Sequence, residues 1–507
     1  MSSVGRLTLS VACLILSLVY SVYYFGLPMP DFPSGCDAFG HLRMAQYVES
    51  GNLLRHDYNR PFHAELIAYL DSKGFQTHQY AWMLAPHAHH VQGHVKRVIN
   101  QYQPGSGALL SLVRLPFRIL FYPFVATLFT IIVLVAASFM ARESAYDGLA
   151  LAAFSVVVVH FFPITEKYFS DPMYLSLPFT FGALIASGYL LRNRTRTAFF
   201  FLGLTLLFRL SNVIYTPVFV LYACIYAKME GMRRRGFILF VAQCLAALLA
   251  GGLGAMLIYQ YGLLGNPWTP TYSQIDTAFI SSFKDFLENL HFYGLKKYGF
   301  TLANVAMLLL IYLLTRNTAR RLSARLFAVL LVAVNYAYYL THQVHIPYYP
   351  FSTAFILLGI VFDLGLKRSE AARPIVTAAA LAICCVVYVV CLAFSDVANL
   401  ELKKKQAVEE TAKLAALFSP FDVVWAEELS GTVEYTSSAN GFRYRWASDE
   451  LRGEIVKWLY DHKYSQAFLL DDLGAHDAVR GFVSLALPNA KPRLMDGARG
   501  PMLVVQP

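Results

Sequence analysis

The sequence predicts an α-helical polytopic membrane protein that ends in a small α/β domain. Three observations predict this fold class. Of the 507 residues, 57% are hydrophobic and only 15% are charged, an apolar share above that of ordinary soluble domains. Many of the apolar residues form runs long enough to cross a bilayer. The basic residues behind the net charge of +10 gather in short loops between these runs, which is typical of membrane topology and not of nucleic-acid binding.

The apolar runs predict about eleven membrane-spanning helices, since one span needs roughly 20 residues. The first run resembles a signal peptide but lacks a small-residue cleavage site, so we interpret it as a retained span. The predicted spans are 7–26, 117–140, 147–163, 173–191, 198–210, 213–227, 237–260, 301–315, 326–340, 351–366 and 375–395.

The Lys and Arg residues of the short loops predict the orientation. With alternating spans, the basic loops at 192–196, 228–235, 316–325 and 367–373 all fall on one side of the membrane, together with Arg6 and Arg142. Basic loops face the cytoplasm. We therefore expect a multi-pass plasma membrane protein, in a bacterium the inner membrane, with a cytoplasmic N-terminus and an extracytoplasmic C-terminus.

The outward segments define the domains. We expect a transmembrane domain over 1–395, including a long outer loop at 27–110, and a soluble extracytoplasmic α/β domain over 396–507. In that last part, helical patterns at 401–418 and 449–462 alternate with short apolar strands at 421–425, 467–470 and 502–505.

Two carboxylates are the candidates for chemistry. Asp37 lies in the run Gly35-Cys-Asp-Ala-Phe-Gly-His-Leu-Arg43, just past the first span. Charges beside hydrocarbon are costly and often mark active sites, although a plain polar loop is the alternative. Asp171 precedes Pro172 at the start of a span and is also a good helix cap. Two carboxylates near one cleft suit general-base work, hydroxyl binding or cation binding.

Three further side chains indicate an anionic ligand on the same face. Arg209 lies near the outer end of a short span, where it predicts contact with a group such as a lipid phosphate; an arginine reaching for the headgroups is the alternative. His342 and His345 lie among aromatic residues in another outer loop and are candidates for the same phosphate.

A histidine cluster, His87-Ala-His-His-Val-Gln-Gly-His94, raises the question of a metal. On a helix, His90 and His94 would share a face. No cysteine or carboxylate adjoins the cluster. We therefore expect a packed loop at the membrane interface and no metal site there.

The ordered motifs resemble the GT-C superfamily of membrane glycosyltransferases, in its protein-mannosyltransferase and aminoarabinose-transferase branch. Asp37 stands where that family has its first acidic motif, and Tyr102-Gln-Pro-Gly-Ser-Gly-Ala-Leu-Leu110 is similar to its Tyr-Pro-Pro-Gly segment. Tyr168-Phe-Ser-Asp171 and Phe208-Arg-Leu-Ser-Asn212 resemble its second acidic motif and its following basic residue. His345-Ile-Pro-Tyr-Tyr-Pro350 resembles the family's late Arg-Tyr-x-x-Pro segment, with histidine in place of arginine.

The resemblance implies an inverting transfer of one sugar from a polyprenyl-phosphate donor to a glycan, lipid or protein acceptor at the outer face. Asp37 and Asp171 would be catalytic, and the donor and its phosphate would be bound by Arg209, Lys167, His345, His342, Asn212, Tyr348 and His41. We interpret His41 and Arg43 as holding the loop more than reacting. Beyond the lipid-linked donor no cofactor is predicted with certainty, and the motifs leave a divalent cation open.

Two other classes compete with an enzyme. A transporter or flippase for lipid-linked sugars would also hold charge within the membrane, but such proteins usually show repeated halves, and none are visible here. A non-catalytic membrane scaffold is the second alternative.

Overall fold

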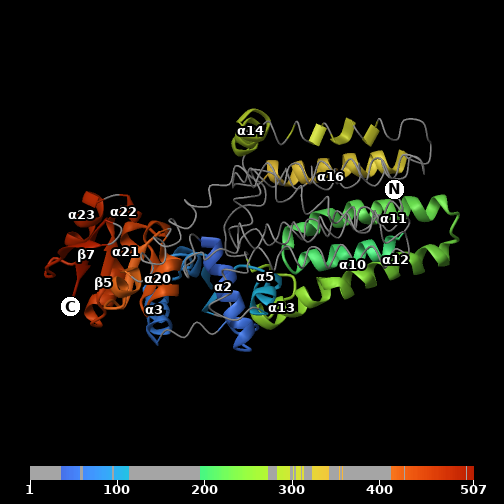
Figure 1. The fold of residues 1–507 in the computed structure, drawn as a ribbon. Coiled ribbons are helices and arrows are strands. Elements are labelled where there is room, and N and C mark those ends of the chain that lie inside the picture. The colour runs from blue at the N-terminus through green and yellow to red at the C-terminus, as the bar shows by residue number, and fades with distance from the viewer. Residues whose placement is uncertain are drawn as a thin grey trace, which may run out of the picture.

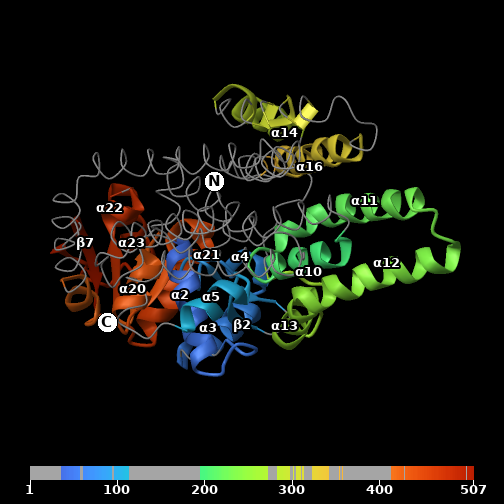
Figure 2. The ribbon, with the colours of Figure 1, turned by 45° about the vertical axis from the view of Figure 1, so that its right-hand side comes forward.

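The computed structural model describes residues 36–56, 61–93, 96–112, 194–271, 283–296, 322–341, 413–427, 429–474, 476–497 and 500–507, with isolated positions between 301 and 357. Within these residues the chain forms three parts in a row. Figures 1 and 2 show the elements of the outer loop lying between a set of long apolar helices and the C-terminal domain.

The apolar part is built from helices that run nearly side by side (Figure 1). Among the described residues, two stretches are long and apolar enough to cross a membrane, Leu210–Met229 with 20 residues and Arg234–Leu264 with 31. The helices of this part are α10 (Thr195–Leu206), η2 (Leu210–Tyr215), α11 (Thr216–Met229), α12 (Arg234–Leu248), η3 (Leu249–Leu253), α13 (Gly254–Leu264) and α16 (Leu322–Leu340).

These helices confirm the predicted spans at 213–227, 237–260 and 326–340 as helical, whereas the span predicted over 198–210 ends four residues early, at Leu206. The spans 301–315 and 351–366 are described only at isolated positions, and the remaining six predicted spans lie outside the described residues. The loop that joins α11 and α12 lies at the end of the bundle farthest from the C-terminal domain (Figures 1 and 2). It contains the basic run 228–235.

Glycines allow α10 and the α12–η3 helix to touch backbone to backbone. A Cβ added to Gly251 would lie 2.0 Å from the carbonyl oxygen of Phe200, and one added to Gly203 would lie 2.2 Å from that of Leu248. Both distances are far below van der Waals contact. The crossing therefore exists only because these positions have no side chain.

We expect Gly251→Val to prevent the folding of this bundle, because the added side chain forces the two helices apart and removes their packing, a loss of several kcal/mol by analogy with overpacked cores. The measurement is the yield of monodisperse protein in detergent and its melting temperature. Gly236→Ala is the matched control, since a Cβ at Gly236, on the same helix, meets nothing within 4 Å. Equal behaviour of the two variants would contradict the tight crossing.

The outer loop folds into short elements beside the ends of these helices. They are α2 (Cys36–Glu49), α3 (Pro61–Ser72), α4 (Thr77–Tyr80), the antiparallel hairpin of β1 (His89–Gln92) and β2 (Arg97–Asn100), and α5 (Pro104–Ser111). Helix α14 (Phe283–His291) and η4 (Phe292–Lys296) lie in a later segment, between α13 and α16. The histidine cluster was predicted as a packed loop, and here the prediction is wrong in part: His89 and His90 lie on a buried strand, because they pair with β2 as β-bridge partners.

The C-terminal domain has a mixed five-stranded sheet in the order β4-β3-β5-β7-β6. Strand β3 is parallel to β4 and β5, and β7 is antiparallel to β5 and β6. Its elements are β3 (Val423–Ala426), α20 (Ser430–Thr436), β4 (Asn440–Arg443), η6 (Tyr444–Trp446), α21 (Asp449–Asp461), β5 (Gln466–Leu469), α22 (Leu470–Leu473), α23 (His476–Ala486), β6 (Arg493–Gly497) and β7 (Gly500–Val505).

The outer loop and the C-terminal domain share one hydrophobic core. Leu66 and Tyr80 of the loop belong to the same buried cluster as Trp425 and Phe468 of the sheet. A polar contact also joins the loop to the C-terminal domain, since Arg443 Nε donates a 2.8 Å hydrogen bond to the carbonyl oxygen of Trp82. Burial of large aromatic groups is the main stabilising contribution of such an interface. The loop residues 62–98 and the C-terminal sheet therefore form one structural unit.

Buried histidines make this unit sensitive to acid. Burial first, and then the charge of Arg443, lower the pKa of His87 and His90 to about 3. A folded-state pKa below the unfolded value of about 6.5 means that the unfolded chain binds more protons between these limits. The free energy of unfolding is therefore not reduced by these groups above about pH 6.5. As the pH drops from there toward 3, each group lowers it by about 1.4 kcal/mol per pH unit.

We expect the melting temperature in detergent to fall steeply from pH 6.5 to pH 4.5, and His90→Phe to make that fall shallower. Neither ring nitrogen of His90 has a hydrogen-bond partner among the described residues, and its ring lies 4.7 Å from that of Trp82, so phenylalanine keeps the packing and removes the proton site. Titrating both proteins by thermal unfolding tests this. His78→Gln, at an exposed position, is the control and should leave the slope unchanged; a slope unaltered by His90→Phe would refute the assignment.

Candidate active site

Helix α2 carries the acidic motif. It begins at Cys36, so Asp37 and His41 lie one turn apart on one face of its first turns. Only 3% of His41 is exposed, and its ring centroid lies 4.4 Å from that of Tyr102. Two sequence motifs, separated by about sixty residues of chain, therefore meet in space.

Two glycines allow α2 and the Tyr102–Leu110 motif to approach closely. A Cβ on Gly40 would lie 2.4 Å from the ring of Tyr102, and one on Gly107 would lie 2.3 Å from Met44 Cγ. Both contacts join α2 to the Tyr102–Leu110 motif. Pro104 occupies the first position of α5, where its fixed φ starts a helix and its missing N–H costs nothing.

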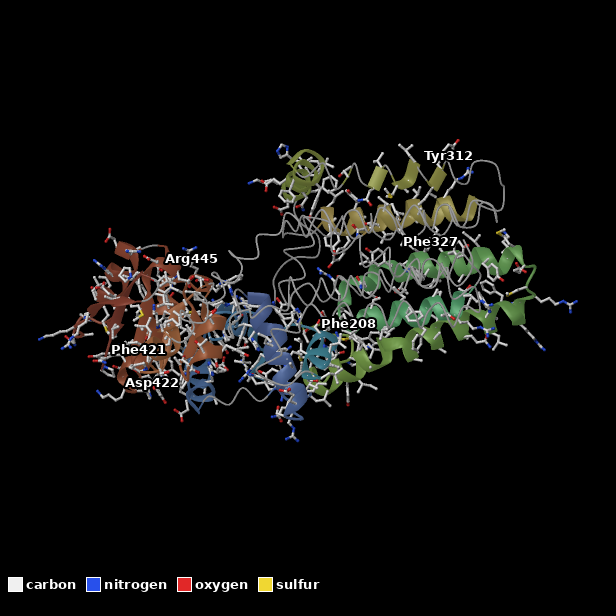
Figure 3. All side chains as sticks on the ribbon, in the orientation of Figure 1. Phe208, Tyr312, Phe327, Phe421, Asp422 and Arg445 are labelled. Atoms are coloured by element: carbon white, nitrogen blue, oxygen red, sulfur yellow. The ribbon has the colours of Figure 1, made fainter. Side chains whose placement is uncertain are left out.

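The same motif also fixes the end of α10. The backbone N–H of Gly105 donates a 2.8 Å hydrogen bond to the carbonyl oxygen of Leu207, and a Cβ on Gly105 would lie 2.5 Å from that oxygen. Phe208, labelled in Figure 3 where the outer loop meets the apolar helices, packs against Leu109 of α5. Arg209 follows Phe208 in the chain, so the packing of Phe208 on α5 determines the position of the Arg209 backbone.

Arg209 lies between two helices. Its backbone is extended, with φ −151° and ψ 108°, between the end of α10 and the start of η2. Its Nε donates a 2.9 Å hydrogen bond to Ser211 Oγ. Burial first, and then the charge of Arg209, lower the pKa of His41 to about 3. His41 is therefore neutral at physiological pH and lies within electrostatic range of Arg209, which also interacts with Tyr338 and Tyr339 of α16.

A buried amide donor adjoins Arg209. Asn212 is 4% exposed, and its backbone N–H bonds to the carbonyl oxygen of Arg209 at 3.1 Å. Its Nδ2 has no hydrogen-bond partner among the described residues. Burying such a donor is costly unless an acceptor pairs with it. Next to a guanidinium, an anionic oxygen is an acceptor that suits both groups.

Asn100, which no sequence motif singled out, joins the acidic motif of α2 to the glycine motif Tyr102–Leu110. Its Nδ2 donates to the carbonyl oxygen of Gly40 at 2.6 Å, and its Oδ1 accepts from the backbone N–H of Tyr102 at 2.9 Å. The backbone N–H of Asn100 donates to His56 Nδ1 at 3.1 Å. This leaves Nε2 of His56 protonated, facing the hydroxyl of Tyr259 on α13 at 3.3 Å. The network fixes α2 against the membrane helices.

The structure brings together three of the predicted site residues, namely His41, Arg209 and Asn212. It places Asp37 on α2, one turn before His41, by its backbone. The other predicted site residues lie outside the described residues; they are Lys167, Asp171, His342, His345 and Tyr348. Over the part of the chain that the structure describes, no group of three or more His, Cys, Asp or Glu side chains is arranged to hold a metal ion.

Comparison with known proteins finds similarity in fold. No protein-family model matches this chain, and no curated protein sequence is significantly similar to it. The solved structure of ArnT from Cupriavidus metallidurans in the apo state superposes with a TM-score of 0.56 at 12% identity, covering 99% of this chain and 98% of ArnT. The structure of the same protein bound to undecaprenyl phosphate gives 0.53 at 13% identity, with 99% and 98% coverage.

The chain therefore has an ArnT-like fold over its whole length, helical with a C-terminal mixed sheet. This confirms the fold that the resemblance to GT-C glycosyltransferases predicted, and it agrees with an integral membrane protein. The sequence identity of 12% between this chain and ArnT supports a common fold, and it does not extend to a common activity.

Proposed function

We propose that this protein is an integral membrane glycosyltransferase that moves a single sugar from a polyprenyl-phosphate donor to an acceptor hydroxyl at the outer face of the membrane. The acceptor class is a cell-envelope glycan, lipid or protein. The observation that carries the proposal is the convergence of α2, with Asp37 and His41, on Arg209 and on Asn212, whose buried Nδ2 has no hydrogen-bond partner within the described part of the chain. A full-length fold in common with a protein crystallised with undecaprenyl phosphate supports the choice of donor.

The reaction needs one base and one phosphate site. Asp37 takes the proton of the acceptor hydroxyl as its oxygen attacks the anomeric carbon. The bond from that carbon to the phosphate oxygen breaks, the configuration inverts, and polyprenyl phosphate leaves. Arg209 and Asn212 bind the phosphate oxygens and stabilise the charge that develops there. A phosphate is a good leaving group, so no second acid is required.

The remaining predicted residues take supporting roles in this scheme. Asp171 binds the sugar or orients the acceptor. Lys167, His342, His345 and Tyr348 add contacts to the donor phosphate and its sugar. Neutral His41 accepts or donates one hydrogen bond in the site without adding charge beside Arg209.

The test is sugar transfer by the purified protein. Mass spectrometry of envelope glycans and lipids, from cells with and without the gene, first identifies the modified acceptor. The purified protein is then given that acceptor and polyprenyl-phosphate sugars extracted from the same cells. We expect a mass increase of one sugar on the acceptor and an equal amount of released polyprenyl phosphate. Movement of an intact lipid-linked sugar across vesicles, with the sugar–phosphate bond uncleaved, would instead establish the flippase alternative.

A further inference from the structure

Helix α20 of the C-terminal domain packs directly on the helix that carries the acidic motif. A Cβ on Gly431 would lie 2.9 Å from both Cβ and Cγ of Phe39, closer than carbon atoms pack. Phe39 is fully buried and lies between Asp37 and His41 on α2. The first turns of α2 therefore rest against the backbone of α20 with no room for a methyl group.

A second contact lies one turn farther along α20. Tyr435, four residues after Gly431, shares its helix face. Its side chain packs against a buried cluster of Leu42, Ala45 and Leu110. Leu42 and Ala45 belong to α2 and Leu110 to α5. A single face of α20 thus touches both helices that meet at the site.

Helix α20 is itself held at both ends. At its start, the backbone N–H of His87 donates a 3.1 Å hydrogen bond to Ser430 Oγ. Near its end, Glu434 Oε2 accepts a 3.1 Å bond from the backbone N–H of Gly441 on β4. All residues from Ser430 to Glu434 are buried. The surface that α20 presents to α2 is therefore fixed by the sheet behind it.

We propose that Gly431 and Tyr435 are positioning residues, through which the C-terminal domain sets the place of α2, and with it Asp37 and His41, relative to Arg209. They touch neither donor nor acceptor. The catalytic and binding roles of Asp37, His41 and Arg209 rest on the function proposed above. The packing of α20 on α2 is independent of that function. A displacement of α2 by a fraction of an ångström is enough to slow a reaction that depends on alignment.

The first test is Gly431→Ala, assayed in the full-length protein for sugar transfer. We expect kcat to fall about 10- to 100-fold, since misplacement of about 1 Å costs that much, with KM for the donor unchanged. Gly453→Ala on α21 and Gly481→Ala on α23 are matched controls, because a Cβ at either position meets nothing within 4 Å. Both should keep wild-type kcat. Wild-type kcat in Gly431→Ala would overturn the proposal.

The second test removes the other contact. Tyr435→Ala deletes the ring that supports Leu42 and Ala45, and we expect it also to lower kcat while leaving KM for the donor in place. Tyr435→Phe keeps the ring, and we expect it to retain kcat. If Phe is as harmful as Ala, packing on α2 is not what Tyr435 provides, and the proposal fails for this residue.

A third measurement does not depend on activity. Amide hydrogen exchange of α2, residues 36–49, should speed up in Gly431→Ala while strands β3 and β5 keep their protection. Loss of protection in the sheet with α2 unchanged would show a purely structural role and overturn the proposal. A wild-type protein that transfers no sugar would defeat the proposed function alone, and the exchange of α2 would still decide the positioning.

Discussion

Asp37→Asn is expected to abolish sugar transfer while the protein still folds and inserts. Asparagine has nearly the same shape but cannot take a proton from the acceptor hydroxyl, and loss of a general base typically costs about 10²- to 10⁴-fold. The measurement is the initial rate of sugar transfer by purified protein, with the amount of enzyme set by its monodisperse peak in detergent. Binding of the donor should persist, because the base acts on the acceptor.

Glu49→Gln is the matched control for this variant. It makes the same chemical change at the exposed end of the same helix, α2, and should keep the wild-type rate. An Asp37→Asn protein with near-normal turnover would show that Asp37 is not the base. Asp171, the other carboxylate predicted to be catalytic, would then be the first residue to test in its place.

Removing the guanidinium of Arg209 is the second change with a large expected effect. Arg209→Ala leaves the donor phosphate without its cation, both when it binds and as negative charge develops on it. We expect a fall in kcat of about 10²- to 10³-fold, the usual effect of losing one such stabilising group, together with a higher KM for the donor. Arg209→Lys keeps the charge but loses the planar pair of donors, so its kcat should lie between those of the wild type and Arg209→Ala.

The result is checked by transfer kinetics and by competition with polyprenyl phosphate itself, which should bind Arg209→Ala more weakly. Arg234→Ala is the control, because Arg234 is an exposed arginine at the start of α12, in the loop region farthest from the C-terminal domain. Weakened binding in both variants to the same degree would indicate a general charge effect instead of a phosphate site at Arg209.

The sequence was sufficient where a local pattern decides the structure. Helix α21 was predicted over 449–462 and runs from Asp449 to Asp461, because Ser448 caps it by accepting from the backbone N–H of Leu451 at 3.3 Å and its buried residues follow the helical period. Strands β3, β5 and β7 were predicted within about two residues, since each is an apolar run. Strand β4, Asn-Gly-Phe-Arg, was missed. Its polar sequence is tolerated because the outer loop and α20 cover it.

The site was predictable in its parts and not in its connections. Charge beside apolar runs singled out Asp37 and Arg209, and the glycine motif singled out Tyr102 and Pro104. Nothing local connects Asn100 to Gly40, because that hydrogen bond spans 60 residues. The contact of Gly431 with Phe39 crosses nearly the whole chain, and a glycine there looks like any other helix glycine until the two helices are placed together.

The shared core of the outer loop and the C-terminal sheet also dictates when this protein becomes complete during its synthesis. Trp82 leaves the ribosome 361 residues before Arg443, which donates a hydrogen bond to its carbonyl oxygen in the folded protein. At 5–20 residues per second the loop waits roughly 20–70 s for its partner. Throughout that time its apolar face is without the sheet that covers it. The sheet can therefore cover the loop only after the last strand has been synthesised, so a prematurely terminated chain can form its apolar helices yet leave the core of the loop exposed.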